Sequence, residues 1–113
     1  MRIVVAGASG FIGTELLRIL SEEDRVSEIV GLSRGNRKPN GKTRWHRVDL
    51  ADLGGLVEAL EGADLAVYLV HSMSPQARMS QGSFEDFDLL QADNFARACR
   101  ADGVKEIIYL GGI

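Results

Sequence analysis

The sequence predicts an α/β fold of three layers, in which a parallel sheet of five strands in the order 3-2-1-4-5 lies between helices. Three observations lead to this prediction. Short apolar runs alternate with helical patterns along the chain. A glycine-rich turn joins the first run to the first helix. Residues 65–70 form a continuous apolar run, as in a parallel strand that is covered on both faces.

Hydrophobic periodicity predicts two strands and a helix in the first third of the chain. We expect one strand at residues 3–6 and a short, buried strand at residues 29–32. The helix between them ends in the charged run 22–25. Its apolar face consists of Ile12, Leu16, Leu17 and Leu20.

The middle of the chain is expected to form a loop and a third strand. Residues 34–42 are polar and rich in residues that break regular structure, and residues 44–48 alternate like a strand. Because this loop is short for a crossover between parallel strands, an antiparallel pairing of the second and third strands stays open.

Glycines mark the boundaries of the later elements. A short helix fits residues 52–60 with Gly62 as its end, although Gly54 and Gly55 each weaken it by roughly 1 kcal/mol. The strand at residues 65–70 follows this helix.

A long helix and a fifth strand complete the pattern. After a loop over residues 71–82, we expect Ser83 to cap a long helix that Gly103 ends. The fifth strand begins at Glu106 and runs to the last residue. This order gives a Rossmann-like domain that spans residues 1–113.

Composition excludes several classes of protein. The chain is 45% hydrophobic and 26% charged, as in ordinary globular domains, and no apolar stretch approaches the roughly 20 residues of a membrane helix. Its net charge of −3 argues against a nucleic acid partner, which would require a broad basic face. The first strand begins at once and leaves no room for a signal peptide, so we expect a cytoplasmic protein.

Cysteine and histidine usage predicts neither a disulfide nor a metal site. Cys99 is the only cysteine, and its helical surroundings indicate a small buried side chain rather than a reactive thiol. His46 and His71 lie far apart, and no further ligand stands at the spacing that a metal site requires.

The glycine turn predicts the ligand. Gly7 permits a tight turn after the strand, Gly10 lets the backbone approach a pyrophosphate, and Gly13 lets the helix pack closely against the strand. Unpaired amides and the positive dipole end of the helix attract the anion. We therefore predict that the chain binds a nicotinamide dinucleotide.

The residues about 20 positions beyond the glycines predict which dinucleotide binds. NAD-binding folds carry an acid there for the ribose 2′-hydroxyl, whereas this chain has Ser33 and Arg34. A cation suits the 2′-phosphate of NADP, to which it makes charge-assisted bonds of about 1.5–3 kcal/mol. We predict NADP, with NAD as the alternative; a solvated basic loop without a ligand role is the remaining interpretation.

Two further segments are expected beside the cofactor, where the strand order reverses. Asp49 is placed to accept from the adenine amino group and Leu50 to pack on its ring; a helix-capping role for Asp49 is the alternative. Val70 and His71 follow the fourth strand and should border the ribose and the nicotinamide. We expect His71 to form a polar wall, with a role as general acid as the alternative.

These residues resemble the short-chain dehydrogenase/reductase superfamily in its extended and atypical branches, which include nucleoside-diphosphate-sugar epimerases and NmrA-like redox-sensing proteins. The resemblance spans the entire chain and rests on the glycine turn, on Asp49 and Leu50, and on segments 62–64 and 102–105. Residues 68–73 and Asn94 resemble a bacterial group of NAD(P)-binding proteins. The resemblance implies cofactor contacts at Gly7, Ser9, Gly10, Phe11, Ile12, Arg34, Asp49, Leu50, Val70 and His71.

The resemblance does not supply a catalytic residue. Enzymatic members use a Tyr-x-x-x-Lys pair, whereas Tyr68 is followed four residues later by Ser72, and Tyr109 by Ile113. We therefore expect the NADP-binding domain of an oxidoreductase or epimerase that acts on a small molecule and is catalytically incomplete in this chain. A sensor of the NmrA-like kind, which binds a dinucleotide without catalysis, is the alternative.

Right-handed crossovers place the first helix on one face of the sheet and the two later helices on the other. Strands four and five are then expected to be bare on the first face, and such a patch rarely stays exposed. We expect the chain to be the N-terminal part of a longer fold, truncated after the fifth strand, or to cover this face by forming a homo-oligomer.

Overall fold

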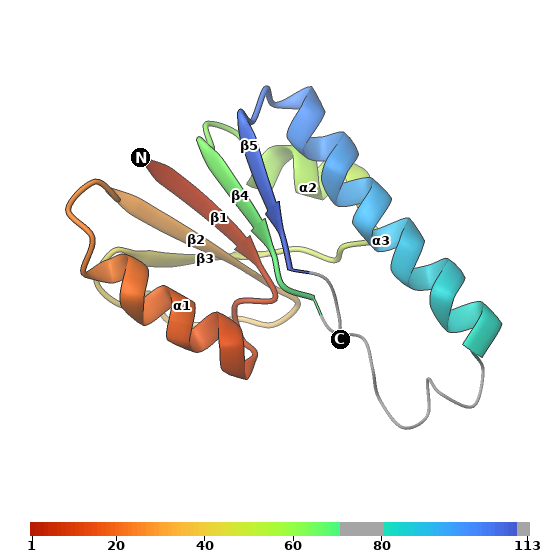
Figure 1. Cartoon of the computed structure of the whole chain (residues 1–113), viewed down its shortest axis with the longest axis horizontal. Helices are drawn as coiled ribbons and strands as arrows, with labels where there is room; N and C mark the ends of the chain where they lie inside the picture. Colours follow the sequence, from red (N-terminus) through yellow and green to blue (C-terminus); the bar gives the residue numbers. More distant parts are fainter. Residues whose placement is uncertain (71–80, 111–113) are drawn as a thin grey trace.

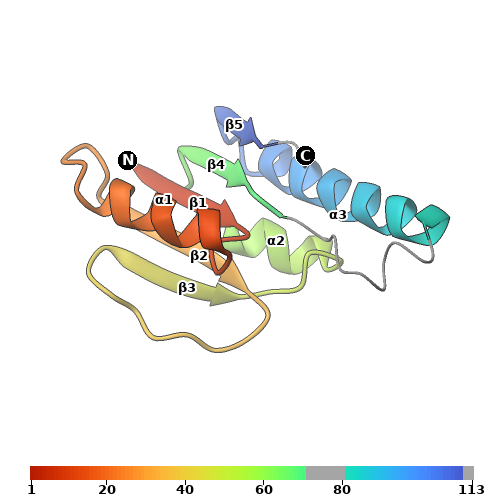
Figure 2. The ribbon, with the colours of Figure 1, turned by 60° about the horizontal axis from the view of Figure 1, so that its bottom comes forward.

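The computed structural model describes residues 1–70 and 81–110, and the side chains of residues 1–70 and 89–110. Its five strands form one sheet in the order β3-β2-β1-β4-β5. Helix α1 covers one face of this sheet, and helices α2 and α3 cover the other (Figure 1; Figure 2). The predicted α/β fold and strand order are confirmed.

Every pair of neighbouring strands is parallel, including β2 and β3, so the antiparallel alternative for that pair is excluded. The strands are β1 (Arg2–Ala6), β2 (Glu28–Ser33), β3 (Thr43–Arg47), β4 (Leu65–Tyr68) and β5 (Glu106–Tyr109). The helices are α1 (Phe11–Ser21), α2 (Leu53–Ala59) and α3 (Gln81–Ala101).

Several predicted boundaries differ from the observed ones by one residue, and two differ by more. Helix α3 already begins at Gln81, so Ser83 lies inside the helix and is not its N-cap. A serine hydroxyl does not by itself start a helix, because serine is tolerated in helix interiors at a modest cost. Strand β4 ends at Tyr68, two residues before the predicted end. The predicted loop over residues 71–82 lies largely outside the described residues, as do residues 111–113 of the predicted fifth strand.

Helix α2 forms despite its two glycines because its first turn is capped. The Asp52 side chain accepts a hydrogen bond from the Gly55 amide at 3.0 Å. A Cβ atom at Gly55 would come within 2.5 Å of the Asp52 carboxylate. The glycine that lowers helix propensity therefore also makes room for the cap.

The alternation of side chains along the strands builds two apolar layers. Val4 and Ala6 point to the α2 and α3 face, where Phe95 of α3 packs with its ring centroid 5.1 Å from that of Tyr68. Ile3 and Val5 point to the α1 face and pack around Leu17. The central strand is therefore buried on both sides, as its apolar sequence predicts.

The face expected to be bare is bare only at its edge. Val67 and Leu69 of the β4 segment are 5% and 7% exposed, because they belong to the same apolar cluster as Leu17 of α1. Ile108, which is paired with Val67, is 48% exposed, and Leu110 is 44% exposed. The expectation is correct for β5 and wrong for β4.

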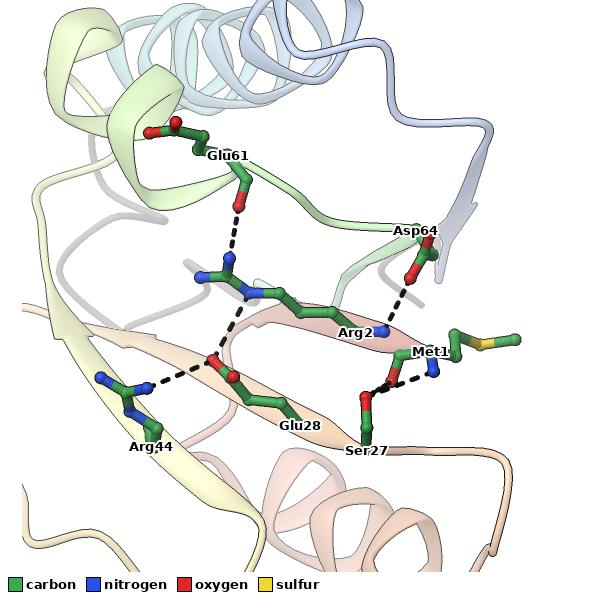
Figure 3. Close-up of polar contacts among 7 residues, drawn as sticks. All are labelled: Met1, Arg2, Ser27, Glu28, Arg44, Glu61 and Asp64. Atoms are coloured by element: carbon green, nitrogen blue, oxygen red, sulfur yellow. Dashed lines mark hydrogen bonds and ion pairs between the residues drawn. The ribbon is translucent and has the colours of Figure 1, made fainter.

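At the amino-terminal edge of the sheet, Arg2 joins several elements (Figure 3). Its guanidinium Nη1 donates to the Glu61 carbonyl at 2.6 Å, and its backbone amide donates to the Asp64 carboxylate at 2.8 Å. Its Nε lies 3.5 Å from the Glu28 carboxylate, which also lies 3.8 Å from Arg44 of β3. One side chain therefore connects β1, β2 and the turn after α2.

Replacing Arg2 by methionine should lower the free energy of unfolding by about 1–2 kcal/mol, because a charged donor to the Glu61 carbonyl is lost while the apolar stem is kept. Urea unfolding measures this change. Arg25→Met is the matched control, since the Arg25 side chain is 80% exposed and its one ion pair with a described residue is with Glu23; it should cost less than about 0.5 kcal/mol. Equal unfolding midpoints for the two variants would contradict this role of Arg2.

Candidate functional site

A cavity of about 260 Å³ opens at the carboxyl ends of β1, β2 and β3, beside the end of β4. The sheet order reverses between β1 and β4, and open parallel sheets bind ligands at the carboxyl edge at such a point. The cavity is lined by Ala6, Gly7, Ser9, Leu32, Ser33, Arg34, Val48, Asp49, Leu50, Val70 and Gln91.

The turn after β1 contains two glycine positions that leave no space for a side chain. Gly7 has φ +83°, and a Cβ atom there would lie 2.8 Å from the Leu69 carbonyl carbon. A Cβ atom at Gly13 would overlap the Gly7 carbonyl oxygen and lie 2.7 Å from the Ala8 Cα. These positions require glycine because the obstructing atoms are backbone, which cannot rotate away.

Gly10 serves a different purpose. A Cβ atom there would meet only the Gly7 carbonyl oxygen, at 3.5 Å, so crowding by the protein does not explain this glycine. Its amide donates to that oxygen at 3.2 Å, and its own carbonyl accepts from the Thr14 amide at 2.8 Å. The absent side chain leaves the backbone open to an approaching ligand.

Helix α1 presents free donors beside the cavity. Gly10 is its N-cap and offers no side-chain oxygen, and no acid stands in the first turn. The amides of Phe11, Ile12 and Gly13 have no acceptor within the helix, because the carbonyls four residues earlier lie outside it. Phe11 is 93% exposed and Ile12 48% exposed, so the contribution of these residues is their backbone.

The outer wall of the cavity carries one cation and one anion. Arg34 is exposed, and no carboxylate in the described part of the chain forms an ion pair with its guanidinium. Its carbonyl accepts from the Arg47 Nε at 3.1 Å, and the neighbouring Ser33 hydroxyl accepts from the Gly35 amide at 3.2 Å. The backbone that carries the cation is therefore fixed while its charge stays available.

Asp49 shapes the loop after β3. Its Oδ1 accepts from the Ala51 amide at 2.9 Å, and its other carboxylate oxygen forms no hydrogen bond with the part of the chain that the structure describes. The alternative role of Asp49 as a helix cap is wrong, since Asp52 caps α2.

Helix α3 supports this loop from the other side. Asn94 is 7% exposed, and its Nδ2 donates to the Leu50 carbonyl at 3.0 Å. Gln91, one turn earlier on the same helix, lines the cavity. Sequence reasoning missed Gln91; its spacing of three residues from Asn94 is the signal that places both side chains on one helix face.

The structure brings together seven of the predicted site residues at the cavity: Gly7, Ser9, Ser33, Arg34, Asp49, Leu50 and Val70. Gly10, Phe11, Ile12 and Gly13 form the adjoining turn and helix start. His71 lies outside the described residues.

Among the described residues, the one thiol adds no reactive group to this cavity. Cys99 is fully buried, and burial, together with the Asp102 carboxylate, raises the pKa of its thiol to about 11, so it stays protonated at neutral pH. The described residues contain no group of three or more His, Cys, Asp and Glu side chains arranged to hold a metal ion.

None of the helices, as far as they are described, is long and apolar enough to cross a membrane.

Comparison with known proteins identifies relatives across the whole chain. The model of the NAD dependent epimerase/dehydratase family matches residues 3–112. The auxiliary protein GraX of Staphylococcus aureus is 27% identical over 111 residues, which cover 98% of this chain and 36% of GraX. The 2-alkyl-3-oxoalkanoate reductase of Stenotrophomonas maltophilia is 29% identical over 114 residues, with coverage of 96% and 32%. The chain thus spans about a third of the length of these relatives.

Solved structures show the same fold. Uronate dehydrogenase from Agrobacterium tumefaciens superposes with a TM-score of 0.77 at 23% identity, over 98% of this chain and 40% of that one. A mutant of that enzyme was solved in complex with NAD. UDP-N-acetylglucosamine 4-epimerase from Bacillus cereus gives a TM-score of 0.77 at 24% identity, over 96% and 34% of the two chains.

Substitution of Gly13 by alanine should lower the free energy of unfolding by about 1–3 kcal/mol, because the added methyl group meets backbone on both sides. Gly35→Ala is the control, since nothing lies within 4 Å of a Cβ atom there; it should change stability by less than about 0.5 kcal/mol. Thermal or urea unfolding of both variants measures the difference. A Gly13→Ala protein as stable as the Gly35→Ala protein would show that α1 does not need this close contact.

Proposed function

Because the chain belongs to the NAD-dependent epimerase/dehydratase family, we propose that its cavity holds the adenosine half of a dinucleotide and that the glycine turn binds the pyrophosphate. The observation that carries this proposal is the start of α1 beside the cavity, with Gly10 as an N-cap that has no side chain. A volume of about 260 Å³ suits part of a dinucleotide rather than the whole molecule.

Each wall of the cavity has a role in this arrangement. The amides of Phe11, Ile12 and Gly13 bind the pyrophosphate, and Ser9 lies at the mouth of the same turn. The adenine ring packs between Leu50 and Val70, with Asp49 as acceptor for its amino group. For His71, which lies outside the described residues, we keep the prediction from the sequence that it borders the ribose and the nicotinamide.

The cofactor we propose is NADP. Ser33 and Arg34, which line the cavity, stand at the sequence position that contacts the ribose 2′ group in such folds. A guanidinium free of carboxylates among the described residues favours a 2′-phosphate, with which it makes charge-assisted hydrogen bonds. A 2′-hydroxyl requires an acceptor there instead, and neither residue supplies a carboxylate.

The reaction class we propose is an oxidoreductase or a nucleoside-diphosphate-sugar epimerase. Matched proteins include a reductase, a dehydrogenase and an epimerase, and the chain corresponds to between 32% and 40% of their lengths. Neither Tyr68 nor Tyr109 has a lysine four residues later. We therefore place the catalytic tyrosine and lysine in the part of the family fold that these 113 residues do not represent.

The same part of the family fold is the partner that we propose for the exposed face of β5. Ile108 and Leu110 are 48% and 44% exposed there. An apolar edge of this kind is a site for pairing or packing. Covering by the rest of the fold removes this exposure without a second copy of the chain.

A sensor that binds the dinucleotide without catalysis is the second candidate. It is favoured by the relative named auxiliary protein GraX, whose name states no reaction. A Tyr-x-x-x-Lys pair in the intact protein, with oxidation of NADPH by a carbonyl substrate, would decide for the enzyme.

Arg34→Asp should weaken NADP binding roughly ten- to a hundredfold and NAD binding less than about threefold, because only NADP carries the 2′-phosphate. Calorimetric titration of the intact protein with each dinucleotide measures both constants. Arg25→Asp is the control with a matched change of charge, at a side chain that is 80% exposed and whose backbone carbonyl accepts from the Met1 amine, at the amino end of β1 and away from the cavity. Equal losses for the two dinucleotides would contradict the choice of NADP, and an absence of heat with either would contradict the dinucleotide site itself.

A further inference from the structure

A second and larger cavity, of about 730 Å³, lies on the α1 face of the sheet. It is bounded by α1 and by the segment of residues 34–42 that joins β2 to β3, and it shares no lining residue with the first cavity. Figure 2 shows this segment running beside β3 as an extended loop. The volume falls in the range of small-molecule sites.

The cavity exists because the crossover contains no helix. Strands β2 and β3 are parallel, and parallel strands are usually joined by a helix that packs on the sheet. Here residues 34–42 run from the carboxyl end of β2 to the amino end of β3 without forming a helix. The space beside α1 that such a helix would fill is therefore open.

The floor of the cavity is an aromatic ring held flat against the sheet. Trp45 of β3 is paired with Gly31 of β2, and a Cβ atom at Gly31 would lie 2.6 Å from the indole. The missing side chain lets the ring rest on β2 with its outer face toward the cavity. The Arg37 guanidinium carbon lies 4.9 Å from the ring centroid.

The lining is positively charged in a chain whose net charge is −3. Its one acid, Glu15, is paired with Arg18, which also lies 3.7 Å from Glu22. Arg37 and Lys38 form no ion pair with any described residue. Two cations therefore stand without a carboxylate partner beside a half-buried aromatic ring, and one of them, Arg37, lies over that ring.

We propose that this cavity is a second ligand site, for a small molecule that carries an anionic group on an aromatic ring. The ring of the ligand stacks on Trp45 in place of the Arg37 guanidinium. Arg37 and Lys38 then pair with its carboxylate or phosphate, and the side chains of Asn36 and Asn40 supply further hydrogen-bonding groups at the loop. This site is separate from the dinucleotide site and does not depend on the function proposed above.

The test observes the Trp45 indole N–H resonance in ¹⁵N–¹H spectra of the intact protein, assigned by its loss in Trp45→Phe. Phenyl phosphate and benzoate are the probes. Inorganic phosphate, which carries only the anionic group, and phenol, which carries only the aromatic ring, are the controls. We expect a saturable shift with at least one probe, at a concentration at least tenfold lower than with phosphate or phenol. The tighter of the two probes identifies the anionic group. No saturable shift with either probe would overturn the proposal.

Paired variants test the two cations. Arg37→Gln combined with Lys38→Gln should weaken binding of the better probe at least tenfold, whereas Arg25→Gln combined with Arg100→Gln should leave it unchanged. Equal thermal midpoints verify that both proteins are folded. Undiminished affinity in the Arg37 and Lys38 variant would overturn the proposed contacts.

A saturating amount of NADP separates this site from the first. We expect the probe-induced shift of Trp45 to persist when the dinucleotide is bound. Displacement of the probe by NADP would show that the cofactor itself occupies the second cavity, and this outcome would overturn the proposal of a separate ligand.

Discussion

The structure depends on a close contact between the first turn of α1 and the backbone that leaves β1. At Gly13 a side chain would overlap the Gly7 carbonyl oxygen, and at Gly7 it would meet the backbone of Leu69. Because glycine carries only a hydrogen atom in place of a side chain at these positions, the helix packs directly against the end of the strand. The positive end of the helix dipole, with its unpaired amides, is thereby brought next to the cavity.

The parallel strands bring the other residues that line the cavity to the carboxyl edge of the sheet. Ala6, Leu32 and Tyr68 are neighbours across β1, β2 and β4, so the chain leaves each of these strands at the same edge of the sheet. The segments that follow carry the cation of Arg34, the carboxylate of Asp49 and the apolar side chain of Val70. Helix α3 then fixes one of them through the hydrogen bond from Asn94 to the Leu50 carbonyl. Residues distant in sequence thus form one cavity.

Local patterns in the sequence were sufficient to predict much of this arrangement. The alternation of apolar runs and helical patterns predicts the strand order, and the glycine spacing predicts the turn at Gly7. These features are readable because each is a local requirement of backbone conformation or burial.

Features that depend on long-range packing were not predictable in this way. The sequence alone does not fix the start of α3, because serines stand both at position 80, directly before Gln81, and at position 83, and each residue type suits a helix start. The place of Gln91 in the cavity wall depends on how α3 crosses the sheet, and the burial of Val67 depends on how far α1 reaches over β4. The second cavity depends on the path of a helix-free crossover, which residues 34–42 reveal only as a loop.

Binding of the pyrophosphate by the start of α1 is tested most directly by ¹⁵N–¹H spectroscopy. The experiment follows the backbone amides of Gly10, Phe11, Ile12 and Gly13 while a pyridine dinucleotide is added to the intact protein. We expect large shifts of these amides that saturate together with those of Leu50 and Val70, because one ligand spans the helix start and the cavity. Amides of the turn that remain unchanged at saturating NADP and NAD would contradict this binding.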